Sequence, residues 1–228
     1  MGNRIHPTAI IGPGVELGEG NVIGPFSVLV GPARIGDGNW FGPRVDIGQP
    51  ADYRGGPHPV GWDGETEGGG VVIGDRNTLR ESVSITQGMF ATTVLGDDCY
   101  LMGRSWIAHD CVVGNAVTIT SGVQVAGHCS VWDGANLGLG TVVHQRTNIG
   151  PCAMVGMGAV VTREVGAFAK VVGNPARSIG FNTVGLSRRG CDDETVLALQ
   201  PYLSGESEVL PAGVPAEVVD LLKAWSER

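Results

Sequence analysis

The sequence has little positive charge and no long apolar run. Its 228 residues include 15 Lys and Arg against 23 Asp and Glu, which gives a formal net charge of −8 and an isoelectric point near 5.0. A protein that binds nucleic acid needs a basic face to meet the phosphates, so this composition argues against such a partner. No stretch reaches the ~18 apolar residues of a membrane span, and the N-terminal MGNRIHPTAI has no apolar signal region. We therefore expect a cytoplasmic protein without a membrane span.

Cysteine patterns typical of metal or redox sites are also missing. The sequence has no C-x-x-C motif and no pair of histidines four residues apart. The cysteines are Cys99, Cys111, Cys129, Cys152 and Cys191. Their odd number and scatter predict small core residues in a reducing compartment. The sequence therefore indicates neither a metal site nor a cofactor.

A six-residue period runs through most of the chain. Apolar residues recur at every sixth position, with Gly often following. The positions are Ile5, Ile11, Leu17, Ile23, Leu29, Ile35, Phe41 and Ile47, then Ile73, Leu79 and Ile85, then Leu95, Leu101, Ile107, Val113, Ile119, Val125, Val131, Leu137, Val143, Ile149, Val155 and Val161. This period is typical of a parallel β-helix, in which six residues make one short strand and one turn. We expect an all-β solenoid whose repeats contact only their neighbours.

The period also fixes which residues lie above one another. Three sides close one coil of about eighteen residues, and stacked coils lie roughly 4.7–4.9 Å apart, so residues eighteen apart should be neighbours. Cys111 and Cys129 should therefore be stacked, and an oxidative cross-link between them is the less favoured alternative to two core thiols.

The period fails in three places. Residues 49–70 are rich in Pro and Gly and indicate an extruded loop, and Thr86 to Thr93 adds a shorter insertion to one coil. Beyond the repeats, the pattern predicts helices over 192–203 and 215–226. We expect a solenoid over 1–180 and a short helical tail over 181–228, whose simplest role is capping or subunit packing.

Three histidines share one edge of this predicted solenoid. His109, His128 and His144 are 19 and 16 residues apart, so they fall within one position of each other on three successive coils. Imidazole can act there as a general base or as a metal ligand, although a single histidine on such a surface is more often without a role. We favour the general base. The adjacent Asp110 either orients the His109 ring or is a solvated turn residue.

Several runs together resemble one enzyme family. They are IHPTAI at 5–10, IGDRNTLRESVSI at 73–85, LMGRSWIAHDCVVGN at 101–115, AGHCSV at 126–131, VVHQ at 142–145 and GLSRRG at 185–190. The sequence resembles the UDP-N-acetylglucosamine acyltransferases of lipid A synthesis over residues 3 to about 190. The resemblance implies a left-handed parallel β-helix and a homotrimer with clefts between subunits. It also implies acyl transfer from acyl carrier protein to a hydroxyl of a nucleotide sugar.

The resemblance assigns catalytic roles to three positions. It implies that His109 is the general base, that Asp110 orients it, and that the Gly127 N–H stabilises the oxyanion. On the same edge, the residues implied to line the cleft and contact the acyl chain or the sugar are His128, His144 and Gln145.

Four further positions are implied to bind substrate. Asn182, Arg188 and Arg189 match positions that hold the nucleotide phosphates or the donor, where guanidinium suits phosphate. Without the resemblance, the residues themselves predict that Arg188 and Arg189 follow a turn without a helix and form a solvated pair on the surface. Met157 stands where a small residue would admit longer acyl chains, which implies a shorter chain, with simple packing as the alternative.

The sequence also departs from the family pattern. Trp106 and Thr86 stand where the family has histidines, and Val184 replaces a glutamate. Residues 56–70 form an insertion whose role the sequence does not give. Because these changes affect the acceptor side, an N- or O-acyltransferase for an amino sugar or specialised metabolite is the alternative, with a coenzyme A thioester as possible donor. A metal-dependent hydratase or a non-catalytic scaffold is less favoured.

Overall fold

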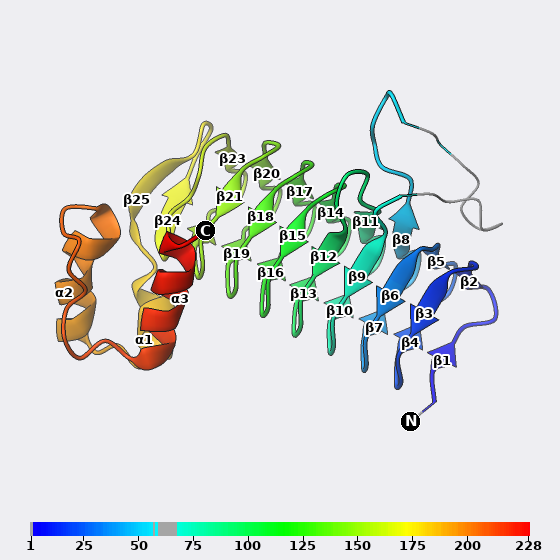
Figure 1. Ribbon diagram of the computed structural model, residues 1–228, viewed down its shortest axis with the longest axis horizontal. Helices are drawn as coiled ribbons and strands as arrows, with labels where there is room; N and C mark the ends of the chain where they lie inside the picture. The colour runs from blue at the N-terminus through cyan, green and yellow to red at the C-terminus, as the bar shows by residue number, and fades with distance from the viewer. Residues whose placement is uncertain (1, 57, 59–67) are drawn as a thin grey trace.

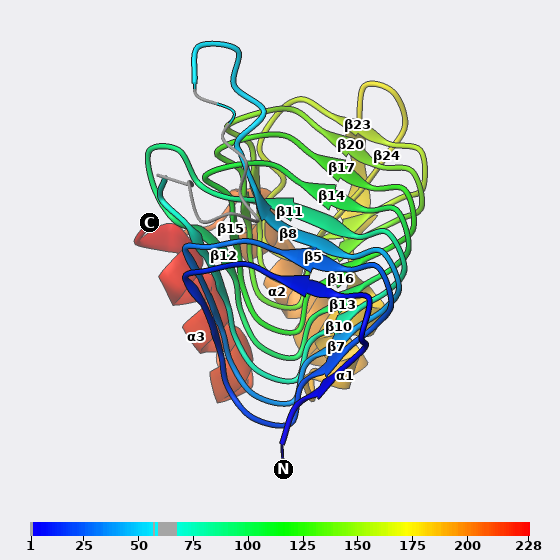
Figure 2. The ribbon, with the colours of Figure 1, turned by 90° about the vertical axis from the view of Figure 1, so that its right-hand side faces the viewer.

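The protein is a triangular column of short strands that ends in three helices (Figure 1). The computed structural model describes residues 2–56, 58 and 68–228. Viewed from the N-terminal end, the chain runs anticlockwise as it recedes, so the solenoid is left-handed (Figure 2). The parallel β-helix that the six-residue period predicts and the left-handed turn that the resemblance implies are therefore both confirmed.

Three sheets form the faces of the column in the described residues. In spatial order, the first face holds β1 (Arg4–Ile5), β4 (Val22–Ile23), β7 (Trp40–Phe41), β10 (Thr78–Leu79), β13 (Tyr100–Leu101), β16 (Thr118–Ile119), β19 (Asn136–Leu137), β22 (Met154–Val155), β24 (Ala169–Val172) and β25 (Arg177–Phe181). The second holds β2 (Ile10–Ile11), β5 (Val28–Leu29), β8 (Asp46–Gln49), β11 (Ser84–Thr86), β14 (Trp106–Ile107), β17 (Gln124–Val125), β20 (Val142–Val143) and β23 (Val160–Val161). The third holds β3 (Val15–Leu17), β6 (Ala33–Ile35), β9 (Val71–Ile73), β12 (Thr93–Leu95), β15 (Val112–Val113), β18 (Ser130–Val131) and β21 (Asn148–Ile149).

The strand register follows the six-residue period. Ile107 pairs with Ile85 on one side and with Val125 on the other, and each is no more than 1% exposed. The same pattern repeats along each face, so the periodic residues stack into one continuous apolar core. β24 and β25 pair antiparallel and end the parallel stack. Burial of this row of side chains is the main stabilisation of the column.

The corner between the second and third faces, which we call the histidine corner, carries both insertions. The extruded segment joins β8 to β9, and the shorter one joins β11 to β12 on the next coil. The two pack together: the Gly69 N–H donates to the Gly88 carbonyl at 2.7 Å, and the Gly88 N–H to the Gly70 carbonyl at 2.9 Å. Most of the insertion at 56–70 lies outside the described residues, but its ends rest on the shorter loop.

Three helices form the C-terminal cap: α1 (Thr183–Arg188), α2 (Asp193–Ser204) and α3 (Ala216–Ser226). α2 and α3 lie within one residue of the predicted helices. The expectation of a turn without a helix before the two arginines is wrong, because Asn182 caps α1 by accepting from the Gly185 N–H. The helix escapes the hydrophobic pattern because it has only 6 residues.

The cap has its own small core, separate from that of the column. It consists of Cys152, Ala167, Phe168, Leu186, Cys191, Val196, Leu199, Val218 and Leu222. All five cysteines are buried and free, as predicted.

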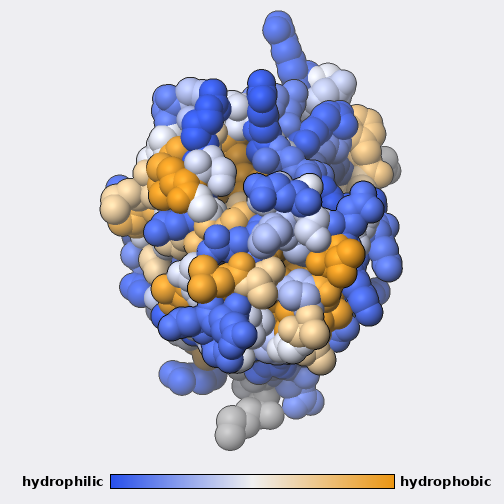
Figure 3. Space-filling view, turned by 90° about the vertical axis from the view of Figure 1, so that its left-hand side faces the viewer, coloured by the Kyte–Doolittle hydropathy of each residue, from blue (hydrophilic) through white to orange (hydrophobic). Residues whose placement is uncertain are grey.

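On the outside of the cap, apolar and polar side chains are mixed (Figure 3), and Leu197 and Val209 are 65% and 75% exposed. Among the described residues, no helix has the length and apolar character to cross a membrane.

Candidate active site

The predicted file of histidines exists, and it lies along the histidine corner. The pairing of β14 with β17 and of β17 with β20 puts His109, Gly127 and Gln145 at the same position on three coils. Asp110 and His128 occupy the next position along the corner. This corner position requires a left-handed backbone, with φ of 59° at Asp110 and 61° at His128.

His109 and Asp110 form a hydrogen-bonded pair. The His109 Nδ1 lies 2.7 Å from the Asp110 Oδ2, and the two side chains are 12% and 1% exposed. Burial acts to raise the pKa of Asp110, but hydrogen bonds from His109 and from three backbone N–H groups outweigh it and hold the pKa below its usual value. An ionised carboxylate only accepts, so Nδ1 carries the proton and the lone pair is on Nε2. Among the described residues, nothing hydrogen bonds to that Nε2.

The second oxygen of Asp110 holds the shorter inserted loop. Its Oδ1 accepts from the backbone N–H groups of Met89, Phe90 and Ala91 at 2.9, 2.8 and 2.6 Å. The Asp110 N–H in turn donates to the Thr93 hydroxyl at 2.9 Å. Asp110 is therefore not a solvated turn residue: it fixes both the histidine ring and the loop beside it. Sequence reasoning missed the role of this loop, and the available signal was that its insertion falls on the same corner as the histidines.

Gly127 provides the space that the His109 ring occupies. A Cβ at Gly127 would lie 2.8 Å from His109 Cε1 and 2.9 Å from Nε2, closer than real Cβ contacts. Within the part of the chain that the structure describes, the Gly127 N–H has no acceptor. The free N–H thus belongs to the glycine that the His109 ring, with its free Nε2, lies over. A hydroxyl at the nitrogen and a carbonyl oxygen at the N–H could be held side by side.

His128 completes the group around Asp110. Its Nδ1 lies 3.7 Å from Asp110 Oδ2, and its ring meets that of His109 edge-on with centroids 5.1 Å apart. One ligand atom from each of His109, Asp110 and His128 lies within 4.8 Å of the others, so these residues could hold a metal ion. A cation among these atoms would displace the proton shared by His109 and Asp110. The arrangement as it stands is a hydrogen-bonded acid–base pair.

The next coil contributes exposed polar groups. His144 and Gln145 are both exposed, and the His144 Nδ1 lies 3.0 Å from the Gln145 carbonyl oxygen. They extend the surface of the histidine corner without contacting the buried pair. Their positions suit contact with a bound molecule.

The remaining predicted residues lie apart from His109 within the protomer. Met157 is 77% exposed at the corner between the first and second faces, after β22. Asn182 caps α1, and Arg189 pairs through its Nε with Glu217 of α3 at 3.1 Å. Arg188 is exposed.

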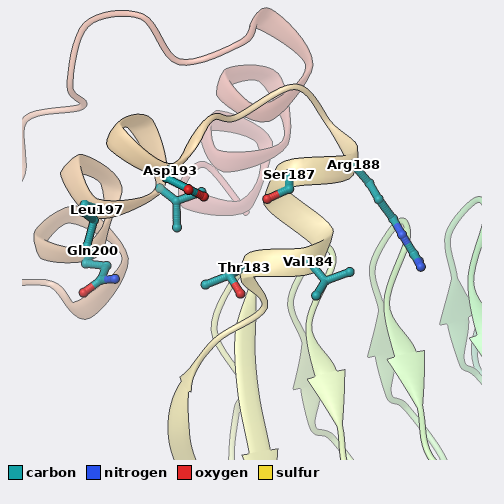
Figure 4. A pocket seen from close by; sticks show the side chains of 8 residues that line it. Thr183, Val184, Ser187, Arg188, Asp193, Leu197 and Gln200 are labelled. Atoms are coloured by element: carbon teal, nitrogen blue, oxygen red, sulfur yellow. The ribbon is translucent and has the colours of Figure 1, made fainter.

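Arg188 lies beside a groove between α1 and α2. The groove has a volume of about 650 Å³. Leu197 and Gln200 of α2 line the side of the groove opposite α1, and the Arg188 side chain extends away from them (Figure 4). Val184, which replaces a family glutamate, is 59% exposed on its lining. One protomer therefore brings together the predicted catalytic residues but not the residues predicted to bind phosphate or to limit the acyl chain.

Comparison with known proteins identifies the relatives of the chain. No protein-family model matches it. It is 42% identical to the UDP-N-acetylglucosamine O-acyltransferase of Burkholderia lata over 212 residues, which cover 86% of this chain and 80% of the relative. The match to the Pseudomonas putida enzyme of the same name is 41% identical over 133 residues, 57% of this chain and 52% of the relative, so the chain spans about half the length of that relative.

A solved structure supports the fold. The UDP-N-acetylglucosamine acyltransferase from Campylobacter jejuni superposes with a TM-score of 0.76 at 24% identity, covering 97% of this chain and 90% of the other. This likeness concerns the fold alone. The match to the Burkholderia protein carries the family assignment, because it extends over most of both chains. The chain therefore belongs to the UDP-N-acetylglucosamine O-acyltransferase family.

Proposed function

We propose that this protein transfers an acyl group from acyl carrier protein to a hydroxyl of UDP-N-acetylglucosamine. The observation that carries the proposal is the His109–Asp110 pair, whose Nε2 is open beside the open N–H of Gly127. The names of the relatives supply the donor and the acceptor. The five buried free thiols suit a reducing compartment, so we assign the reaction to the cytoplasm.

The reaction begins with the acceptor hydroxyl against His109. Nε2 takes the hydroxyl proton as the oxygen attacks the thioester carbonyl, and the carbonyl oxygen becomes an oxyanion. The Gly127 N–H donates to that oxyanion, an interaction typically worth 10²–10³-fold in rate. When the carbon–sulfur bond breaks, His109 returns the proton to the leaving thiolate. The products are an ester and a free carrier thiol, and His109 is again neutral.

Asp110 serves this sequence by fixing the tautomer. Its carboxylate accepts from Nδ1–H, which keeps the lone pair on Nε2, and it stabilises the imidazolium that forms during attack. His128, His144 and Gln145 would position the acyl chain and the sugar on the same corner.

A homotrimer would complete the site. Met157 and Arg188 are exposed, and Asn182 is half-buried, at other corners or in the cap. A second copy packed along the column could present such residues to the first copy's histidine corner. In that arrangement Met157 would limit the acyl chain, and Asn182, Arg188 and Arg189 would meet the nucleotide phosphates.

A second candidate is an acyltransferase with a different acceptor. Where the family has a histidine, Thr86 is 4% exposed, and its hydroxyl has no hydrogen-bond partner among the described residues. Trp106 projects from β14 at the position of another family histidine. Fewer polar groups face the acceptor side, which favours an amino sugar or specialised metabolite, with coenzyme A as a possible carrier.

Mass spectrometry of reaction products tests the proposal. Purified protein is mixed with UDP-N-acetylglucosamine and acyl carrier proteins that carry short to long chains. An acylated nucleotide sugar supports the proposed function and gives the chain length. If the nucleotide sugar stays unmodified while an amino sugar or a coenzyme A thioester reacts, the second candidate replaces it. Metal analysis of the active protein separates both from a hydratase.

A further inference from the structure

Four aromatic rings lie in a row that leads outward from the base. The His109 ring contacts His128, whose ring stacks on Phe90 with centroids 6.0 Å apart and an angle of 22° between planes. Tyr53 meets Phe90 edge-on at 5.9 Å. Tyr53 and Phe90 come from the two inserted segments, and the histidines come from the repeats. Three separate parts of the chain thus build one continuous aromatic surface.

The two outer rings of the row are more exposed than the two histidine rings, and Phe90 is the most exposed of the four. The side chains of His109 and His128 are 12% and 23% exposed, whereas Tyr53 and Phe90 are 43% and 69% exposed as residues. A phenylalanine this exposed costs free energy that ligand binding would recover. Phe90 is therefore a candidate contact for a bound molecule.

Phe90 is also held in place. Its own N–H and those of Met89 and Ala91 donate to Asp110 Oδ1, which belongs to the acid–base pair. Met89 packs against the extruded loop: a Cβ at Gly56 would lie 2.8 Å from the Met89 methyl carbon. The ring is presented on an anchored backbone, so contact with a ligand costs little conformational entropy.

We propose that Phe90, flanked by Tyr53 and His128, forms an aromatic subsite for the sugar ring of the acceptor. The reacting hydroxyl must lie ~3 Å from His109 Nε2. In the proposed binding mode, the six-membered ring that bears this hydroxyl lies along the row of rings, beside His128 and against Phe90. The apolar C–H face of a hexose suits an aromatic face. Stacking would compensate for the family histidines that Thr86 and Trp106 replace. The subsite rests on the proposed function for the identity of the acceptor.

Calorimetric binding to the intact protein, without donor, tests the subsite independently of turnover. UDP-N-acetylglucosamine and UDP are titrated into wild type, Phe90→Ala, Phe90→Leu and Phe90→Tyr. We expect Phe90→Ala and Phe90→Leu to weaken binding of the nucleotide sugar roughly 3–10-fold and Phe90→Tyr to preserve it. Binding of UDP should be the same in all four, because UDP lacks the N-acetylglucosamine ring. Phe26→Ala is the matched control, since Phe26 is 62% exposed on an early coil.

Kinetics add a second readout, with acyl carrier protein thioester and UDP-N-acetylglucosamine as substrates. We expect Phe90→Ala to raise the KM for the nucleotide sugar, with kcat and the KM for the thioester within about twofold of wild type. If wild type binds the nucleotide sugar through Phe90 but transfers no acyl group, the proposed function fails and the subsite stands. If Phe90→Ala transfers with the wild-type acceptor KM, the subsite fails and the proposed function stands.

Other outcomes also overturn the subsite. If Phe90→Leu binds UDP-N-acetylglucosamine as tightly as wild type, any apolar side chain suffices at this position and stacking on the aromatic ring is not needed. Equal weakening for UDP would assign Phe90 to the nucleotide, and a changed acyl chain preference would assign it to the donor. A change in oligomer mass by light scattering would make Phe90 a contact between copies. Wild type that does not bind the nucleotide sugar would refute the subsite together with the proposed acceptor.

Discussion

The histidine corner and the corner between the third and first faces, which we call the acidic corner, repeat with the same spacing but satisfy their side chains differently. At the acidic corner each side-chain oxygen accepts the backbone N–H one coil earlier, at 2.7–2.8 Å. The acceptors are Asp37, Asp75, Asp97, Asn115 and Asp133. Each oxygen occupies the space that a Cβ would take on the Gly before its partner, at Gly18, Gly36, Gly74, Gly96 and Gly114.

At the histidine corner a glycine likewise leaves room for a side chain of the adjacent coil, but that side chain is an imidazole. Gly127 leaves room for the His109 ring as Gly114 leaves room for the Asp133 carboxylate. The difference is what remains unpaired. The acidic corner uses its oxygens to join one coil to the next, whereas Nε2 and the Gly127 N–H remain open among the described residues. In a repeat protein, hydrogen-bonding groups that neighbouring coils leave unpaired at one corner therefore indicate a functional site.

The largest expected effect comes from His109→Ala. Loss of the base should lower kcat about 10⁴-fold, while Tm should change by no more than 2–4 °C, about 1 kcal/mol. Asp110 keeps its three backbone donors, so the corner should stay folded. Steady-state kinetics and thermal unfolding measure the two effects. The matched control is His6→Ala, since His6 is exposed on the first coil. A collapse in Tm would make His109 structural.

Asp110→Asn sharpens the role of the carboxylate. The Asn oxygen can still accept from the loop N–H groups, but its amide would donate to His109 Nδ1 and move the ring proton to Nε2. We expect kcat to fall about 10²–10³-fold with the fold retained. NMR of the imidazole nitrogens measures the tautomer directly. An unchanged tautomer with full activity would refute the orienting role.

Gly114→Ala tests the acidic corner. A Cβ there would lie 2.0 Å from the Asp133 Oδ1, so the Asp133 side chain and its hydrogen bond to the previous coil must shift. We expect a loss of roughly 1–3 kcal/mol in the free energy of unfolding, with kcat nearly unchanged because the site lies on another corner. Denaturant unfolding and kinetics on one preparation check both. A large loss of kcat at full stability would remove the distinction between the corners.

The smallest effect concerns acid. The pKa of Asp110 is held below its usual value, so its carboxylate stabilises the fold fully above the unfolded pKa of about 3.9. That stabilisation is lost as the pH falls through the lower folded pKa. The stability of wild type relative to Asp110→Asn should therefore shrink below about pH 4. Thermal unfolding across this range measures the difference, and a gap that widens in acid would contradict the assignment.

The sequence predicted the column because its period is local and strictly repeated. The placing of His109, His128 and His144 on one edge followed from counting eighteen residues, since these coils have the same length. The sequence did not reveal how Asp110 holds Met89 to Ala91, because that contact joins a side chain to backbone N–H groups about 20 residues away. Nor did it predict Phe90 against His128, since ring contacts depend on the path of an irregular loop.

The cap shows the same limit. α2 and α3 have enough apolar residues to be predicted, but α1 depends on the cap at Asn182. The pairing of Arg189 with Glu217 of α3 depends on how the helices pack. The sequence therefore predicted which residues share a corner of the column more reliably than it predicted which groups they contact.

Gly127→Ala gives the most direct test of the central claim. At the histidine corner, the claim is that a glycine which leaves room for a neighbouring side chain serves catalysis, whereas at the acidic corner it serves stability. The added methyl group would lie 2.8 Å from Cε1 and 2.9 Å from Nε2 of His109, so the ring must shift. Activity and thermal unfolding should be measured together on this variant and on wild type. We expect a loss of about 10²-fold or more in kcat with Tm within a few degrees of wild type. Full activity in a variant that stays folded would contradict a catalytic role for this corner.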